Sequence, residues 1–132
     1  MITLDTGAVT ALLVRNEPHH DSAVRALATA REPVVVPLAV LPEVDLALSH
    51  LAPGDATVAL LDGIQRGDSL LDCGDLDLRR IRELMTVYRD LSIGLAGAAV
   101  VACAERNGGA VLSFGREALR TVAREVPITL LR

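Results

Sequence analysis

The sequence contains no Trp and no Lys, and Tyr88 and Phe114 are its only Phe, Tyr or Trp residues. Proteins that bind single-stranded nucleic acid by base stacking need several aromatic side chains on one surface, so this binding mode is disfavoured. We expect both rings to lie in the core. The formal net charge of −4 argues against a broad basic surface that holds nucleic acid. An enzyme that contacts a few phosphates locally stays compatible with this composition.

Cysteine is also scarce, with only Cys73 and Cys103. Neither belongs to a CxxC motif or to a Cys/His cluster with the spacing of zinc ligands, which excludes the usual structural zinc sites. We expect apolar surroundings for both cysteines and find no secretory signal, so we expect two reduced thiols in a cytoplasmic protein. No apolar run reaches the ~18 residues of a membrane span, and we therefore expect no membrane association.

Ala, Val and Leu are abundant instead. Hydrophobic residues make up 51% of the 132 positions and charged residues 23%, which predicts a folded domain with an aliphatic core rather than a disordered chain. A length of roughly 100–150 residues is typical of one domain, so we expect a single domain over residues 1–132.

Short apolar runs alternate with amphipathic segments along the chain. The predicted strands are Ile2–Asp5, Val34–Val36, Ser69–Asp72, Ala110–Ser113 and Ile128–Leu131. The predicted helices are Gly7–Val14, Ser22–Arg31, Leu38–His50, a helix that begins at Pro53-Gly54-Asp55, a helix that ends at Tyr88, Ile93–Arg106 and Glu117–Arg124. This alternation is typical of a parallel sheet covered by helices on both faces. Functional sites in such sheets lie beyond the carboxyl ends of the strands, where the strand order reverses.

Two carboxylates follow predicted strands. Asp5 ends the first strand beside the start of a helix, where it is suited to binding a cation or to capping the helix dipole. Thr6 is a further candidate for the cap of that helix. Glu43 has the apolar neighbours Leu41 and Val44, and lies either at the rim of the sheet or on a solvated helix face. The residue types alone leave both alternatives open.

Three stretches of the chain, 1–13, 34–48 and 88–119, carry four motifs that resemble those of PIN-domain ribonucleases. The family's opening strand and Asp-Thr-Ser-Ala turn are similar to MITLDTGAVTALL, and its second strand with a Glu-bearing helix is similar to VVVPLAVLPEVDLAL. A later helix, strand and turn of the family resemble YRDLSIGLAGAAVVACAERNGGAVLSFGREAL. The match keeps order and spacing over the whole chain, and it is strongest to the VapC toxins of bacterial toxin–antitoxin pairs. It implies a PIN-like three-layer α/β/α fold with a central, mostly parallel sheet of four to five strands.

The resemblance also implies an RNA-cleaving site in which about four carboxylates hold Mg²⁺ or Mn²⁺. Such hard cations prefer oxygen ligands, and they activate water and stabilise the charge that builds on the phosphate. Asp5 matches the first carboxylate of the family and Glu43 the second. The third and fourth positions fall on Gly97 and Gly115, so the resemblance predicts a remnant site that binds metal weakly or not at all.

Further positions of the motif carry secondary expectations. The serine of the family's opening turn is Gly7 here, whereas Thr6 keeps a hydroxyl group, and Arg116 follows the fourth carboxylate position. Asp90 is the best candidate for a replacement ligand, although we interpret it as a cap at the start of the next helix. Glu117 is the second candidate and is expected to face solvent.

These observations predict a VapC-like protein with weak or no catalysis that acts as a binding module. Loss of one well-placed electrostatic group typically costs ~10²–10³ in rate, and two are lost here. The alternatives are an active metal-dependent ribonuclease toxin that uses Asp5, Glu43 and a substitute ligand, and an unrelated doubly wound domain. By resemblance, we expect a VapB-like antitoxin as partner, RNA as a further ligand and a homodimer. The apolar helices Ala8–Val14 and Leu38–Leu51 are the candidate contact surfaces.

Overall fold

Five short strands form one parallel sheet in the computed structural model, which describes residues 1–52 and 54–132. The strands are β1 (Ile2–Leu4), β2 (Val34–Pro37), β3 (Leu70–Asp72), β4 (Ala110–Leu112) and β5 (Thr129–Leu131). They lie in the order β3-β2-β1-β4-β5, and every neighbouring pair is parallel. The prediction of a mostly parallel sheet with four to five strands is therefore confirmed.

The central strand, β1, is buried throughout. Its Ile2 is aligned with Val34 of β2 on one side and with Ala110 of β4 on the other. By contrast, Leu70 and Leu71 of the edge strand β3 are 49% and 40% exposed. Inner strands covered on both faces have continuous apolar sequences, which explains why the sequence pattern located them.

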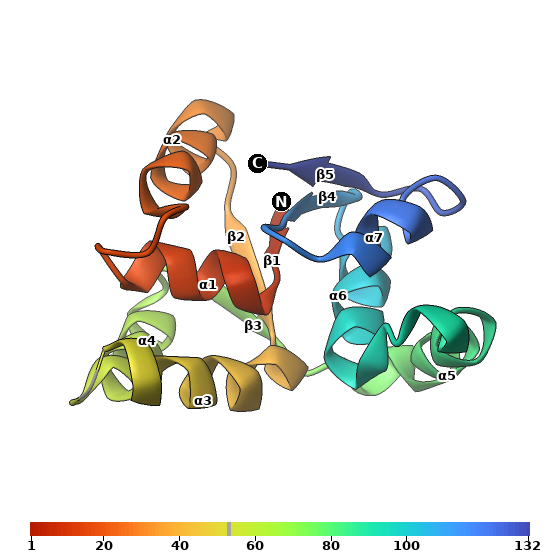
Figure 1. The fold of residues 1–132 in the computed structure, drawn as a ribbon, viewed down its shortest axis with the longest axis horizontal. Helices are drawn as coiled ribbons and strands as arrows, with labels where there is room; N and C mark the ends of the chain where they lie inside the picture. Colours follow the sequence, from red (N-terminus) through yellow and green to blue (C-terminus); the bar gives the residue numbers. More distant parts are fainter. Residues whose placement is uncertain (53) are drawn as a thin grey trace.

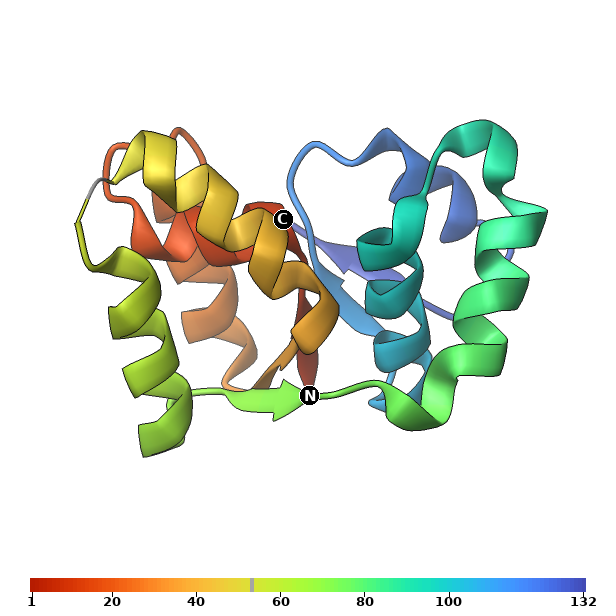
Figure 2. The ribbon, with the colours of Figure 1, turned by 90° about the horizontal axis from the view of Figure 1, so that it is seen from below.

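In the described part of the chain, seven helices cover the sheet, as Figures 1 and 2 show for their arrangement. Four of them lie together on one side of the strands: α1 (Thr6–Leu13), α2 (His20–Ala30), α3 (Leu41–Leu51) and α4 (Ala56–Arg66). The other three lie on the opposite side: α5 (Leu78–Val87), α6 (Gly94–Arg106) and α7 (Glu117–Val122). This arrangement is the predicted three-layer α/β/α fold. Within residues 1–52 and 54–132, none of the helices has the length and apolar character needed to cross a membrane.

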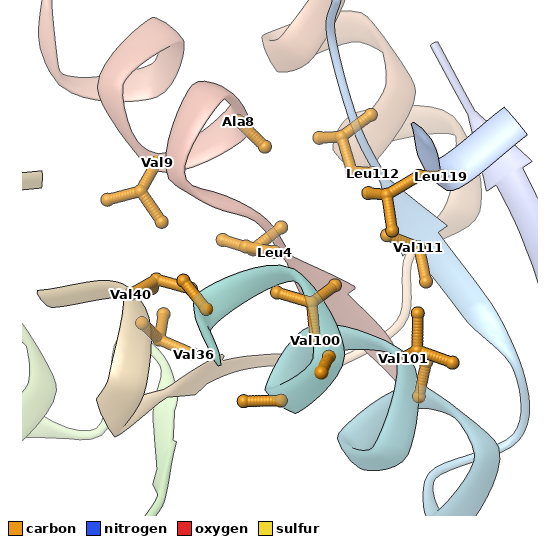
Figure 3. Packing of buried hydrophobic residues seen from close by; sticks show 14 of the residues in the cluster. Leu4, Ala8, Val9, Val36, Val40, Val100, Val101, Val111, Leu112 and Leu119 are labelled. Atoms are coloured by element: carbon orange, nitrogen blue, oxygen red, sulfur yellow. The ribbon is translucent and has the colours of Figure 1, made fainter. Parts of the chain in front are cut away.

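Helix α6 forms the centre of the core. Its residues from Ala96 to Ala104 are all buried, and their small side chains allow the helix to lie close to the sheet. Figure 3 shows Val100 and Val101 of this helix facing Leu4 of β1 and Val111 of β4. The packing fixes the carboxyl ends of β1 and β4 relative to the first turn of α6.

The predicted helix over Leu38–His50 is divided in the structure. Residues Leu38–Val40 form a 3-10 turn, η1, and α3 begins at Leu41. Pro42 has no N–H with which to reach the carbonyl of Leu38, so an uninterrupted α-helix would lack this hydrogen bond. The Leu41 N–H donates to that carbonyl instead. Pro53, the predicted start of the next helix, lies outside the described residues.

The two cysteines are free but differ in environment. Cys103 in α6 is 2% exposed, and burial raises the pKa of its thiol to about 11. Cys73 is exposed, so the expectation of apolar surroundings for both thiols is wrong for Cys73.

A thiol-labelling experiment should separate these two environments. We expect a maleimide at neutral pH to label Cys73 quickly and Cys103 only after unfolding, because Cys103 is enclosed and stays protonated. Mass spectrometry of timed samples measures both rates, and C73S is the control that should leave no rapidly labelled site. Equal labelling of both thiols in the folded protein would contradict the packing of α6.

Candidate functional site

The strand order reverses between β1 and β4, and the candidate residues lie at the carboxyl ends of these strands. β1 leads directly into Asp5 and α1, and β4 leads into residues 113–116. Glu43 joins them from the first turn of α3, which follows β2. At such a reversal point the loops that follow the two strands lead to opposite sides of the sheet and leave a crevice between them. Ligands of open parallel sheets usually bind in this crevice.

Asp5 is fully buried at the start of α1. Its Oδ1 accepts a hydrogen bond from the Ala8 N–H at 2.8 Å, and its Oδ2 accepts one from the Ser113 hydroxyl. Asp5 is thus the cap of α1, and the interpretation of Thr6 as the cap is wrong because Thr6 is the first residue of the helix. Burial raises the pKa of Asp5, while the hydrogen bonds from Ser113 and Ala8 and the charge of Arg116 oppose this rise.

Arg116 lies between Asp5 and Glu43. Its Nη2 donates to Glu43 Oε2 at 2.5 Å and to Thr6 Oγ1 at 3.3 Å. Its Nε is 3.9 Å from Asp5 Oδ2. The Thr6 hydroxyl in turn donates to Glu43 Oε2 at 2.6 Å. Asp5, Glu43, Thr6 and Arg116 therefore form one network, which we call the Arg116 cluster.

Gly97 and Gly115, which the sequence resemblance matches to the family's third and fourth carboxylates, have different surroundings. Gly97 is buried in α6, and a Cβ atom at this position would lie 2.9 Å from Ile93 Cγ1 and 3.4 Å from Arg116 Nη1. Position 97 therefore borders the Arg116 cluster. Gly115 lies in the turn after β4 with a φ of +83°, and its Cβ position is open. Neither glycine supplies an oxygen ligand from a side chain.

The two proposed replacement ligands are occupied elsewhere or exposed. Asp90 lies in the exposed 3-10 turn η3 (Arg89–Leu91), and α6 begins at the cap residue Ile93 without a side-chain hydrogen bond. The interpretation of Asp90 as the helix cap is therefore wrong, because the turn separates it from the first residues of α6. Glu117 pairs with Arg120 at 3.2 Å, and its side chain is 80% exposed, as expected for a solvent-facing residue.

The side chains at this site do not fit a divalent cation. In the part of the chain that the structure describes, no three His, Cys, Asp or Glu residues are grouped so that they could hold a metal ion. Both oxygens of Asp5 already accept hydrogen bonds, and no buried side-chain N or O atom of the described residues lacks a partner. A guanidinium group lies beside both carboxylates. Mg²⁺ usually keeps several waters and takes one or two carboxylates, so it is the positive charge of Arg116 beside Asp5 and Glu43 that opposes a cation here.

A pocket of about 240 Å³ opens beside the Arg116 cluster. It is lined by His19, Ser22, Ser113, Phe114, Gly115, Arg116, Arg120, Leu130 and Arg132, a set of described residues with three arginines and no acidic side chain. Tyr88 is buried as predicted, but Phe114 is only half-buried and stacks on His19 with ring centroids 4.8 Å apart. This face of the molecule is suited to anionic groups rather than to a metal cation.

Comparison with known proteins identifies relatives over most of the chain. The family model described as "PIN domain" matches residues 2–125. Ribonuclease VapC26 of Mycobacterium tuberculosis is 30% identical over 104 residues, which cover 78% of this chain and 77% of that protein. The family match includes the segments that carry Asp5, Glu43 and Gly97.

Solved structures with similar folds agree with this assignment. The M. tuberculosis protein VapC20, whose structure is described as that of a sarcin-ricin loop cleaving toxin, superimposes with a TM-score of 0.74 and 21% identity over 97% of this chain and 98% of that one. FitAcB from Neisseria gonorrhoeae gives a TM-score of 0.61 and 16% identity over 100% and 97% of the two chains. At these identities the two structures show the fold alone. Taken with the family match and the VapC26 homology, the chain belongs to the PIN-domain family and is a protein of the VapC type.

Proposed function

We propose that this VapC-like protein, folded as a single domain over residues 1–132, hydrolyses RNA weakly or not at all and acts by binding. The observation that carries this proposal is the composition of the Arg116 cluster. Two carboxylates, Asp5 and Glu43, come together there with an arginine instead of with further acidic residues. PIN-domain ribonucleases are generally dependent on a divalent metal, and this site lacks the oxygen ligands that would hold one.

The alternative is an active ribonuclease that uses Asp5, Glu43 and a substitute ligand on Mg²⁺ or Mn²⁺. The relative named Ribonuclease VapC26 favours this alternative at the level of the family. The geometry opposes it, because Glu117 is paired with Arg120 and Asp90 lies in an exposed turn outside α6. Neither side chain is grouped with Asp5 and Glu43 in the described residues.

The partner that we propose is a VapB-like antitoxin, with RNA as a second ligand and with a homodimer in the cytoplasm. Three leucines in residues 38–51 are exposed to solvent. The exposed fractions of Leu38, Leu46 and Leu51 are 43%, 64% and 55%. The other candidate surface, helix α1, is mostly buried. We therefore assign the antitoxin contact to η1 and α3 rather than to α1.

RNA cleavage by the purified protein tests the proposal. The protein and its D5A variant are incubated with total bacterial RNA and with Mg²⁺ or Mn²⁺, and the products are separated on sequencing gels. We expect the wild type to give no metal-dependent cleavage above the level of D5A, because the site lacks the ligands that would activate water. Metal-dependent cleavage that D5A abolishes would establish the active ribonuclease instead.

A further inference from the structure

The Arg116 side chain differs in environment from the other paired arginines. Of the arginines that form ion pairs in residues 1–52 and 54–132, Arg116 has the least exposed side chain, at 26%. The next values are 39% for Arg80 and Arg106. Exposed pairs on a protein surface are usually worth little, whereas partial enclosure reduces screening by solvent. Arg116 is therefore the paired arginine whose charge is screened least.

We infer that Arg116 takes the place of a divalent cation at this site, so that its guanidinium is a built-in counter-ion for Asp5 and Glu43. The inference rests on the proposed function and deepens it, because it gives a physical reason for the lack of metal binding. The guanidinium donates to Glu43 at 2.5 Å and lies 3.9 Å from Asp5. These are the two acidic side chains that a metal ion in this position would need.

The space available to the Arg116 guanidinium depends on the absence of a side chain at position 97, which the family resemblance matches to the third carboxylate. A Cβ atom at position 97 would lie 3.4 Å from Arg116 Nη1, so a larger side chain at this position would meet the guanidinium directly. The turn that precedes Arg116 contains Gly115 at a φ of +83°, a conformation that glycine adopts without strain. The same two glycines that remove oxygen ligands therefore also shape the place that Arg116 occupies.

Charge explains why the arginine and a metal ion exclude one another. Asp5 and Glu43 contribute two formal negative charges, and Arg116 neutralises one of them within hydrogen-bond distance. A divalent cation that entered the site would have to displace a guanidinium held by Glu43 and Thr6, and it would then face a positive charge at close range. Removal of the Arg116 charge should thus reveal a metal affinity that the wild type lacks.

A Mn²⁺ titration followed by water-proton relaxation or calorimetry tests this inference without any measurement of activity. We expect R116Q to bind Mn²⁺ at least ten times more tightly than the wild type, and R116K, which keeps the charge, to resemble the wild type. The matched control is R120Q, because Arg120 lines the same pocket but pairs with Glu117. It should leave Mn²⁺ binding unchanged. Adding E43Q to R116Q should remove the gain.

Thermal unfolding supplies a second measurement that does not depend on the folding of R116Q. Mg²⁺ should leave the Tm of the wild type unchanged, because only a ligand that binds the folded state stabilises it. A Mg²⁺-induced rise in Tm of the wild type that is lost in E43Q would overturn the inference. Equal Mn²⁺ affinity of the wild type and of folded R116Q would overturn it as well. RNA cleavage by the wild type would instead overturn the proposed function, so the two failures are distinguishable.

Discussion

The triple variant G97D/G115D/R116Q is expected to cleave RNA in the presence of Mg²⁺ at least ~100-fold faster than the wild type, since one catalytic electrostatic group is typically worth ~10²–10³ in rate. The two aspartates would return the third and fourth carboxylates that the family resemblance places at these positions. The third substitution removes the guanidinium, which would otherwise neutralise the new carboxylate at position 97 across a Cβ to Nη1 distance of 3.4 Å. Gel-based cleavage assays at several Mg²⁺ concentrations measure the gain.

Two controls separate the contributions to this gain. The double variant G97D/G115D keeps Arg116, and we expect it to gain less activity and to bind Mn²⁺ more weakly than the triple variant. Adding D5A to the triple variant should abolish cleavage. Both substitutions cost stability. The buried Ile93 side chain must move away from a Cβ atom at position 97, and position 115 has a φ of +83°, which strains any side chain although Asp tolerates it better than most. A triple variant that folds but gains neither Mn²⁺ binding nor cleavage would contradict the placement of the site.

The D5A variant is expected to lose about 2–3 kcal/mol of unfolding free energy, because an unsatisfied buried group costs roughly 1–3 kcal/mol and a lost helix cap about 1 kcal/mol. The substitution leaves the Ala8 N–H and the Ser113 hydroxyl without their acceptor inside the protein. Relief from burying a charge offsets part of this loss, since burial already raises the pKa of Asp5. Urea unfolding followed by circular dichroism measures the change, which corresponds to a Tm roughly 5–15 °C lower.

Two variants control for the loss of charge and for general effects of removing a carboxylate. D5N keeps an oxygen that caps α1, and we expect it to retain most of the stability that D5A loses. D90A removes an exposed carboxylate from η3 and should change the unfolding free energy by less than about 0.5 kcal/mol. A D5A variant as stable as D90A would show that Asp5 does not connect α1 to β4.

The sheet was predictable because its inner strands are covered on both faces. Val34–Val36 and Ala110–Leu112 are apolar without interruption, which is the pattern of buried parallel strands, and helical segments separate them. The division of residues 38–50 into η1 and α3 was missed, although Pro42 supplies a signal for it. Hydrophobic periodicity is insensitive to the loss of a single N–H donor. A 3-10 turn followed by a helix therefore has the same apolar pattern as one continuous helix.

The candidate site was predictable only in part. The positions of Asp5 and Glu43 after strands made them candidates, because the carboxyl ends of parallel strands meet at one edge of a sheet, and the family resemblance then singled them out. Capping of α1 by Asp5 was one of two alternatives that the sequence left open, whereas the placement of Asp90 in an exposed turn outside α6 was not predicted, since it depends on the course of that turn. The ion pair of Arg116 with Glu43 joins residues 73 positions apart, and no local sequence pattern predicts it.

The sequence by itself predicted the α/β fold class, and its resemblance to PIN-domain ribonucleases predicted the family and marked Asp5, Glu43, Gly97 and Gly115 as the positions to compare with the family's carboxylates. The fold class follows from residue types and short-range periodicity and the rest from the order of the family's motifs, and all of these are present in the chain before it folds. Only the tertiary structure decided that a guanidinium lies where the carboxylates converge. The contacts of Arg116 with Thr6 and of Ser113 with Asp5 span 110 and 108 positions, and they form because the strand order places β4 next to β1. An arginine side chain has no preferred partner until the sheet brings the carboxylates within its reach.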